Sequence, residues 1–272
     1  MSGGTGVWTY SITQSGSPAG LSGLTGVGGT TVRTTACAGL TAVVSDVSLA
    51  EFGEAALRRN LENLDWLDDV ARAHHDVIDA ASRIFELLPA RLATVYSGDA
   101  ALCAALAARR DQLIDTLHRV GGRAEWGVKA YAAPEPDPQG PPGEARGRAD
   151  TEADTEAGTE AGGGGLAYLR RRRARLTAER GFRSAAVSGA RAVHAGLSGQ
   201  AEGARLHPPQ AAQLSQVRLP MLLNAAYLLP AGDGTSFAAA VAAEASAHPE
   251  LRIELTGPWP PYSFVGDDDD RR

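Results

Sequence analysis

The middle of the chain, residues 133–165, contains almost no side chain that a folded core could bury. It consists mainly of Pro, Gly, Glu, Asp, Thr and Ala and includes the near-repeat TEADTEAGTEAG. Segments of this composition do not bury enough apolar surface to offset the entropy lost on folding. We therefore expect a disordered acidic insertion at 133–165, with the folded parts of the chain on either side of it.

The rest of the chain has the composition of a globular protein. The 272 residues are 43% hydrophobic, which is enough to bury real cores. A net charge of −6 argues against extended contacts with nucleic acid or anionic lipid, because both need a basic surface. The most apolar run, 219–230, is shorter than the roughly 20 residues of a membrane helix and is typical of an interior strand. We expect no nucleic acid partner and no membrane partner.

The two cysteines and the N-terminal residues indicate in which cellular compartment the protein is expected. Cys37 and Cys103 are far apart in the sequence and fit neither a disulfide framework nor a CxxC metal site. We therefore expect them to suit a reducing compartment. The opening residues MSGGTGVWTYSITQ lack the basic start and apolar centre of a signal peptide. Both features predict a cytoplasmic protein.

Residues 1–84 are predicted to form an N-terminal α+β domain. Three β-rich runs, 7–13, 31–38 and 40–47, predict a small antiparallel sheet, and Gly39 offers the positive φ of a tight connection. From Glu54 to Ala81, apolar residues recur at intervals of three and four, which is the pattern of one amphipathic helix. The expected unit is a sheet covered by a helix.

Residues 85–266 are predicted to form a second α+β domain with a modified ferredoxin-like fold. Strands are expected at 87–96, 123–131, 219–229 and 251–256, with helices between the members of each pair. Setting aside the insertion and a helical arm at 166–205, the order is β-α-β followed by β-α-β, the split order of a ferredoxin-like sheet. Residues 267–272 are expected to be a solvated acidic tail.

No group of residues predicts catalysis, a metal site or a cofactor. His75 and Asp79 share a helix face, but no third and fourth ligand is apparent, and His74 falls on the apolar stripe, where a packing role is usual. The carboxylates Asp65, Asp68 and Asp69 lie on the expected exposed side of the helix, where their pKa values would not be driven apart. We therefore predict a protein that is not an enzyme.

Two segments are candidates for binding a partner protein. The basic cluster Arg170, Arg171, Arg172 and Arg173 favours an acidic partner segment, and its plainer interpretation is a solvated helix face. The C-terminal run LTGPWPPYSFV carries Trp259, Tyr262 and Phe264 on an extended, proline-rich backbone. These aromatic rings form either a lid packed on the core, which is the favoured interpretation, or a preorganised docking surface.

The same ending, ELTGPWPPYSF at Glu254–Phe264, resembles that of the gas vesicle protein F and L family. Further blocks resemble this family, and together they cover nearly all ordered segments. They are RRNLENLDWLDDVARAHHDVIDAA at 58–81, LPARLATVY at 88–96, GRAEWGVKAY at 122–131, AYLRRRR at 167–173 and LNAAYLLP at 223–230.

The resemblance implies an accessory or minor structural protein of gas vesicle assembly, located in the cytoplasm or on the gas vesicle. Its expected partners are the hydrophobic major shell protein, whose aggregation it would limit during nucleation, and other gas vesicle accessory proteins. The resemblance also implies two α+β domains, no catalysis and no cofactor. Two alternatives are a purely structural component of the vesicle wall and an RNA-binding or enzymatic ferredoxin-like protein.

Overall fold

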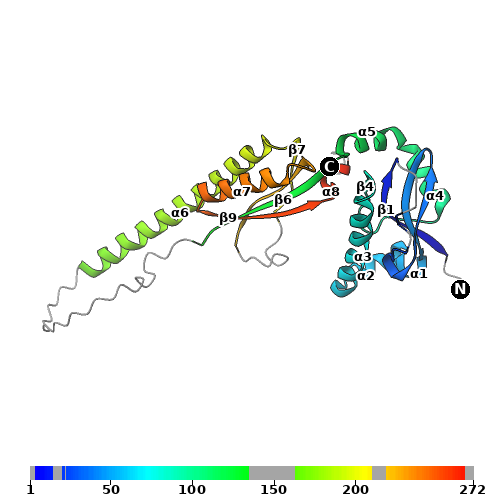
Figure 1. Ribbon diagram of the computed structural model, residues 1–272. Helices are drawn as coiled ribbons and strands as arrows, with labels where there is room; N and C mark the ends of the chain where they lie inside the picture. The colour runs from blue at the N-terminus through cyan, green and yellow to red at the C-terminus, as the bar shows by residue number, and fades with distance from the viewer. Residues whose placement is uncertain (1–3, 15–19, 22, 135–162, 210–218, 267–272) are drawn as a thin grey trace, which may run out of the picture.

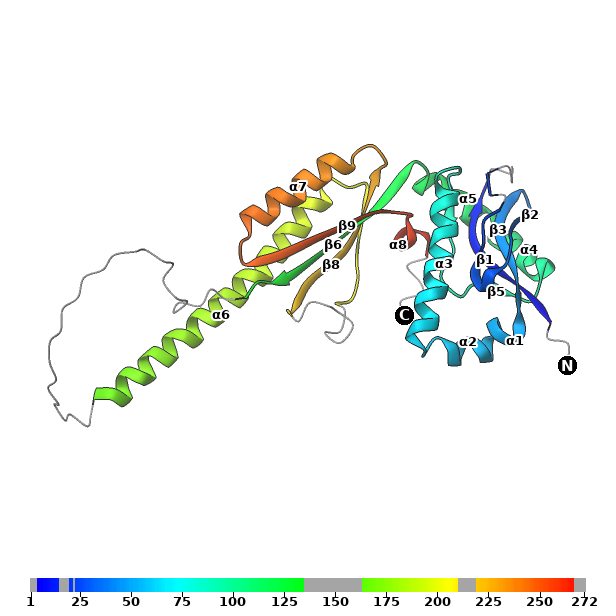
Figure 2. The same cartoon turned by 60° about the horizontal axis from the view of Figure 1, so that its bottom comes forward.

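The chain folds into two antiparallel sheets, each covered by helices, in an elongated molecule (Figures 1 and 2). This computed structural model describes residues 4–14, 20–21, 23–134, 163–209 and 219–266. Nearly all of the predicted insertion at 133–165 and the whole of the predicted tail at 267–272 therefore lie outside the described residues. The mixed α+β class predicted from the sequence is confirmed.

The first sheet has the strand order β2-β3-β1-β4, with β5 also paired to β1. Its strands are β1 (Thr5–Thr13), β2 (Val32–Cys37), β3 (Leu40–Ser48), β4 (Leu88–Pro89) and β5 (Val95–Tyr96). The strands predicted at 31–38 and 40–47 are confirmed as the β2–β3 hairpin. Its turn places Ala38 and Gly39 at positive φ, 53° and 79°, so the left-handed backbone predicted at Gly39 is present.

Helices bury both faces of this sheet. On β3, Val43 and Val47 belong to one core cluster, whereas Ala42 and Val44 belong to the other, because successive side chains point to opposite faces. The cluster of Val43 includes residues of α3 (Leu64–Ser82), and the cluster of Val44 includes residues of α4 (Asp99–Ala108) and α5 (Arg110–Val120). A strand covered on both sides explains the apolar run Ala42–Val44 in β3.

The predicted strand at 87–96 is wrong in extent and in sheet membership. The segment forms two short strands, β4 and β5, which both pair with β1 of the first sheet. The helices that follow, α4 and α5, pack on the same sheet. The ferredoxin-like order predicted from residue 85 onward therefore fails for residues 85–120, because sequence patterning identifies a strand or helix but not the sheet that it joins.

The single helix predicted from Glu54 to Ala81 is interrupted. Before it, the short helix α1 (Leu49–Phe52) begins at Ser48, whose hydroxyl accepts a hydrogen bond from the Ala50 amide. The predicted helix itself is α2 (Glu54–Asn60) followed by α3, with a turn between them. Asn63 caps α3 by accepting hydrogen bonds from the amides of Asp65 and Trp66, at 3.1 and 3.3 Å. Leu64, expected on the buried stripe, is 74% exposed because it lies at this interruption.

The second sheet has the strand order β7-β8-β6-β9, with every neighbouring pair antiparallel. Its strands are β6 (Arg123–Ala132), β7 (Gly203–Leu206), β8 (Met221–Pro230) and β9 (Leu251–Trp259). Helices α6 (Gly163–Ser198) and α7 (Gly234–Ala247) contribute buried residues to the core on one face, together with β6, β8 and β9. The short helix α8 (Tyr262–Val265) follows β9.

The helical arm predicted at 166–205 is only partly an arm. The C-terminal part of α6 packs on the second sheet and buries Ala186, Ala190, Val193 and Leu197. The N-terminal part projects beyond the sheet (Figures 1 and 2). Residues 203–206 form β7, an edge strand that the sequence analysis placed in the arm, because four residues carry too little periodicity to reveal a strand.

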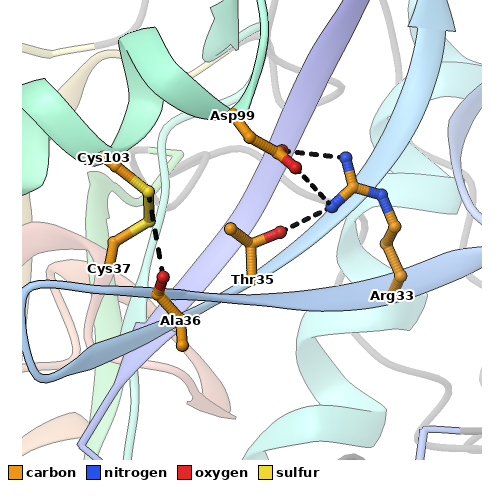
Figure 3. The surroundings of a disulfide bond; sticks show 6 residues. All are labelled: Arg33, Thr35, Ala36, Cys37, Asp99 and Cys103. Carbon is orange, nitrogen blue, oxygen red and sulfur yellow. Dashed lines mark hydrogen bonds and ion pairs between the residues drawn. A yellow bond between two sulfur atoms is a disulfide. The ribbon is translucent and has the colours of Figure 1, made fainter.

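The expectation that Cys37 and Cys103 are separate thiols is wrong. They form a disulfide between the end of β2 and α4, with Cα atoms 4.9 Å apart (Figure 3). Close by, the Arg33 guanidinium pairs with Asp46 at 2.6 Å and with Asp99 at the start of α4 at 2.9 Å. These bonds raise the pKa of Arg33 above its usual value. The packing of α4 against β2 brings together two cysteines that are 66 residues apart.

Reduction of the Cys37–Cys103 disulfide is expected to destabilise the protein. Closing a loop of this length restricts the unfolded chain and contributes about 4 kcal/mol in the chain-entropy treatment. Urea unfolding of the wild type with and without dithiothreitol should show a lower midpoint after reduction. The double variant Cys37→Ser, Cys103→Ser should match the reduced wild type and should not respond to dithiothreitol. Equal midpoints for the oxidised and reduced wild type, with thiol titration verifying both states, would contradict the expectation.

Candidate functional site at the junction of the two sheets

The C-terminal segment Trp259–Val265 lies between the two sheets and contacts both. Figures 1 and 2 place α8 between the second sheet and the helices of the first. The Phe264 ring is 3% exposed and belongs to the core cluster that contains Leu88 and Leu117 from the first unit and Leu228 from β8. One aromatic side chain therefore completes a core that the two sheets share.

Partly buried hydrogen bonds hold this segment in place. The Glu125 carboxylate on β6 accepts hydrogen bonds from the amide and the hydroxyl of Ser263, each at 2.7 Å. Arg119 at the end of α5 donates to the Phe264 carbonyl at 3.1 Å, so the segment is also bonded to the first unit. Burial raises the pKa of Glu125, while the Ser263 hydrogen bonds and the charge of Arg205 act in the opposite direction.

The backbone before this segment requires a glycine. Gly257 has φ of 124°, and a Cβ there would lie 2.9 Å from the Glu125 carbonyl oxygen. The peptide bond from Gly257 to Pro258 is cis. The motif GPWPPYSF therefore combines a glycine that approaches β6 closely with prolines that restrict the path toward α8.

A groove of about 610 Å³ opens beside this junction. We call it the junction groove, and it is lined by the end of α3 and the following residues up to Leu87, by 120–124, by Ala231 and by Pro258–Pro261. Trp259 is 42% exposed at the groove, and its ring meets the His75 ring edge-on with centroids 5.4 Å apart. Ile84, which also lines the groove, is 46% exposed. Arg83 and Asp79 line the groove as well, and they form an ion pair at 2.7 Å.

The three predicted aromatic residues have different environments. Trp259 faces the junction groove, whereas Phe264 is buried and offers no contact surface in this structure. Tyr262 is half-buried against the core on the α3 side, and burial raises the pKa of its hydroxyl, with Glu125 and Asp79 adding to the effect. Phe264 is thus packed as expected for a lid on the core. Of the three aromatic side chains, Trp259 is the most exposed and is the one best placed to contact a partner.

The structure does not bring the predicted arginines to these aromatic residues. Arg170, Arg172 and Arg173 are exposed on the projecting part of α6, and the side chain of Arg171 lies outside the described residues. This part of α6 is at the end of the molecule away from the first sheet (Figure 1). The predicted partner-binding residues thus form two separate surfaces.

The packing role predicted for His74 is confirmed. The side chain is 3% exposed, its Nδ1 accepts a hydrogen bond from Trp8 Nε1 at 2.9 Å, and its Nε2 donates to the Ala90 carbonyl at 3.1 Å. Burial lowers the pKa of His74 from 6.5 to about 4. Within the described ranges, no group of three or more His, Cys, Asp or Glu side chains is arranged to hold a metal ion.

Glu125 and Ser263 were missed by the sequence analysis. Glu125 stands in β6 next to Trp126, and a lone carboxylate in a mostly apolar strand was the only signal that it is buried. Its partner is 138 residues away, so no local pattern connects the two.

Among the helices that the structure describes, none is both long and apolar enough to cross a membrane.

Fold and site together define a mixed α+β scaffold of two antiparallel sheets, joined by a buried C-terminal segment beside an open groove. The chain matches the family described as gas vesicle synthesis protein GvpL/GvpF over residues 6–266. It therefore belongs to the GvpL/GvpF family of proteins involved in gas vesicle formation.

Individual relatives agree with this assignment. The chain is 38% identical to gas vesicle protein L of Streptomyces sp. (strain CB03234) over 262 residues, which is 95% of this chain and 92% of that protein. The crystal structure of GvpF from Anabaena sp. PCC7120 is similar in fold, with a TM-score of 0.62 at 18% identity and 97% of both chains covered. GvpF from Microcystis aeruginosa gives 0.61 at 18% identity, with 96% of this chain and 99% of that chain covered.

The stability of the protein is expected to depend on His74 at acidic pH. The folded-state pKa lies below the unfolded value of 6.5, so this contribution is complete above pH 6.5 and is lost as the pH falls toward 4. The total loss is on the order of 3 kcal/mol, since each pKa unit corresponds to about 1.4 kcal/mol. Urea unfolding from pH 7.5 to 4 should show this loss in His75→Gln, which keeps the buried imidazole. The loss of stability should be smaller in His74→Gln, which lacks the buried imidazole. Identical pH profiles for the two variants would show that His74 is not the group responsible.

Glu125→Ala is expected to release the C-terminal segment from the junction. The substitution leaves two partly buried donors of Ser263 without their acceptor and should cost about 2 kcal/mol of stability. Hydrogen exchange at residues 262–265 should accelerate more than exchange in β1 and β3. Glu254→Ala is the matched control, because this β9 carboxylate pairs with Arg252 on the surface. Unchanged exchange at 262–265 would show that Glu125 does not anchor the segment.

Proposed function

We propose that this chain is an accessory protein of gas vesicle assembly that binds the hydrophobic major shell protein and limits its aggregation while the vesicle nucleates. The junction groove is the proposed contact. The chain also contacts other accessory proteins of the assembly in this proposal, and it works in the cytoplasm and on the forming vesicle. Membership of the GvpL/GvpF family supports a role in gas vesicle assembly. The groove supports binding of the shell protein at this place on the chain.

The exposure of Trp259 at the junction groove is the observation on which this proposal depends. Large aromatic residues are enriched among the residues that dominate protein interfaces. Here Trp259 stands between Pro258 and Pro260 in the sequence, and Ile84 and Phe85 line the same groove. An apolar segment of a client could be covered in this groove without any rearrangement of the two sheets.

The second sheet adds a feature that suits a client with strand-forming segments. β9 is the last strand in the order β7-β8-β6-β9 and leads directly into Trp259. An edge strand can pair with an added strand, which supplies main-chain hydrogen bonds while neighbouring pockets take side chains. A client strand beside β9 would continue toward the junction groove.

We also infer that residues 123–265 form a modified ferredoxin-like domain. The chain order β6-α6-β7-β8-α7-β9 and the strand order β7-β8-β6-β9 correspond to a βαββαβ unit, with the projecting part of α6 as its elaboration. The first domain would then run to Val120, and the Gly121–Gly122 turn would connect the two. This division replaces the boundary at residue 84.

Trp259→Ala is expected to weaken shell-protein binding roughly tenfold or more without unfolding the chain. Light scattering of shell protein diluted from denaturant should rise again when this variant replaces the wild type. Leu64→Ala is the matched control, because Leu64 is a more exposed apolar residue at the opposite end of α3 from the groove wall. Equal suppression of aggregation by a folded Trp259→Ala variant would remove the groove from the proposal.

A second comparison tests the basic surface and the alternative role in the wall. Replacement of Arg170, Arg172 and Arg173 by Ala should leave suppression of shell-protein aggregation unchanged, because the projecting part of α6 that carries them is at the end of the molecule away from the first sheet. The protein should also be depleted from washed, mature vesicles if its capture of the shell protein is transient. Stoichiometric retention would favour a purely structural component of the vesicle wall.

A further inference from the structure

The projecting part of α6, residues 163–185, is a helix without a covering element among the described parts of the chain. We call it the arm. None of its described side chains is buried, and burial begins at Ala186, where α6 reaches the second sheet. The arm carries seven arginines and one glutamate. It therefore presents a strongly basic surface on a chain whose net charge is −6.

One face of the arm combines these charges with exposed apolar side chains. Leu169 and Leu176 are seven residues apart and Val187 follows after eleven, so all three point to nearly the same side of an α-helix. Their side chains are 59%, 45% and 38% exposed. The same face also carries arginines between the apolar positions, namely Arg172, Arg173, Arg180 and Arg183. A partner for this face needs carboxylates spaced along a surface that also has an apolar hollow.

The first unit of the same protein has such a surface on α3. A hollow of about 390 Å³ is lined by Phe52, Trp66 and Val70 and is bordered by carboxylates. These carboxylates are Glu51, Asp69 and Asp76. The α3 helix carries five aspartates and one arginine, so its exposed side is acidic. Because its lining is apolar, this surface is more than a cluster of like charges: it can bind apolar and basic side chains together.

The two surfaces also match in spacing. Asp69 and Asp76 are seven residues apart on α3, and Arg173 and Arg180 are seven residues apart on the arm, about 10 Å in each helix. Leu176 lies between the two arginines in the sequence, and Val70 and Ala73, which line the hollow, lie between the two aspartates. In such a contact Leu176 would be covered by the hollow, and the two arginine–aspartate ion pairs would lie on either side of it. Apolar contacts at the centre and charge pairs at the rim are typical of protein interfaces.

Within one molecule the arm and the α3 surface cannot meet. They lie at opposite ends, with the second sheet between them (Figures 1 and 2). We propose that the arm of one copy docks on the α3 surface of a second copy. Because the two surfaces differ, the contact is head-to-tail and each added copy leaves one arm and one α3 surface free. The proposal concerns self-association and does not depend on shell-protein binding at the junction groove.

Sedimentation velocity over a wide range of protein concentration tests this contact. At about 50 mM salt the wild type should form species that grow with concentration, and at about 500 mM salt it should be monomeric, because exposed ion pairs are screened. An arm variant, Arg173→Glu with Arg180→Glu, and a surface variant, Asp69→Lys with Asp76→Lys, should each remain monomeric alone. An equimolar mixture of the two should associate, because one partner retains the native arm and the other the native α3 surface.

A control variant separates this contact from a general effect of charge. Arg191→Glu with Arg252→Glu reverses two exposed arginines outside the arm and should associate as the wild type does. Circular dichroism should show that every variant is folded. A monomeric wild type at low salt would overturn the proposal. It would also be overturned if the surface variant associated normally, or if deletion of residues 144–160 were required for association, which would assign the arm to the acidic segment of its own chain.

Discussion

The insertion of Phe264 between the two sheets is the contact on which the arrangement of this molecule depends. Its ring shares a core with residues of both units, while Glu125 on β6 and Arg119 on α5 bond the same short segment from either side. Because the buried carboxylate and its two donors satisfy one another, the segment can remain buried without an unpaired polar group. The position of α8 in turn fixes the prolines and Trp259 that line the junction groove.

The two units are stabilised in different ways. The first sheet is buried on both faces, and its edge strand β2 is tied to α4 by the disulfide and by Arg33. The second sheet is covered by helices on one face, and its covering helix α6 continues far beyond the sheet. The two units give the molecule chemically different ends, one acidic at α3 and one basic at the arm. The proposed function uses the groove at the end of α3, whereas the proposed self-association uses the hollow farther along α3 and the arm.

The first unit was predicted well where the pattern was local. The β2–β3 hairpin, the helical character of 64–81 and the packing role of His74 follow from periodicity and turn residues. Residues 87–96 were assigned to the wrong sheet because β4 and β5 are two-residue strands whose pairing with β1 spans more than 70 residues. Likewise, the aromatic motif was recognised, but the different exposures of Trp259 and Phe264 depend on which neighbouring elements cover each ring.

The sequence by itself determined the α+β class, most strands and helices, the basic arm and membership of a family, because these depend on composition, periodicity and motif. The tertiary structure alone decided which sheet each element joins, the Cys37–Cys103 bond, the Glu125–Ser263 anchor and the groove beside Trp259. Each of these unites residues separated by tens of positions or more. Such contacts arise from packing between elements, and a local pattern carries no information about the partner on the other side of the contact.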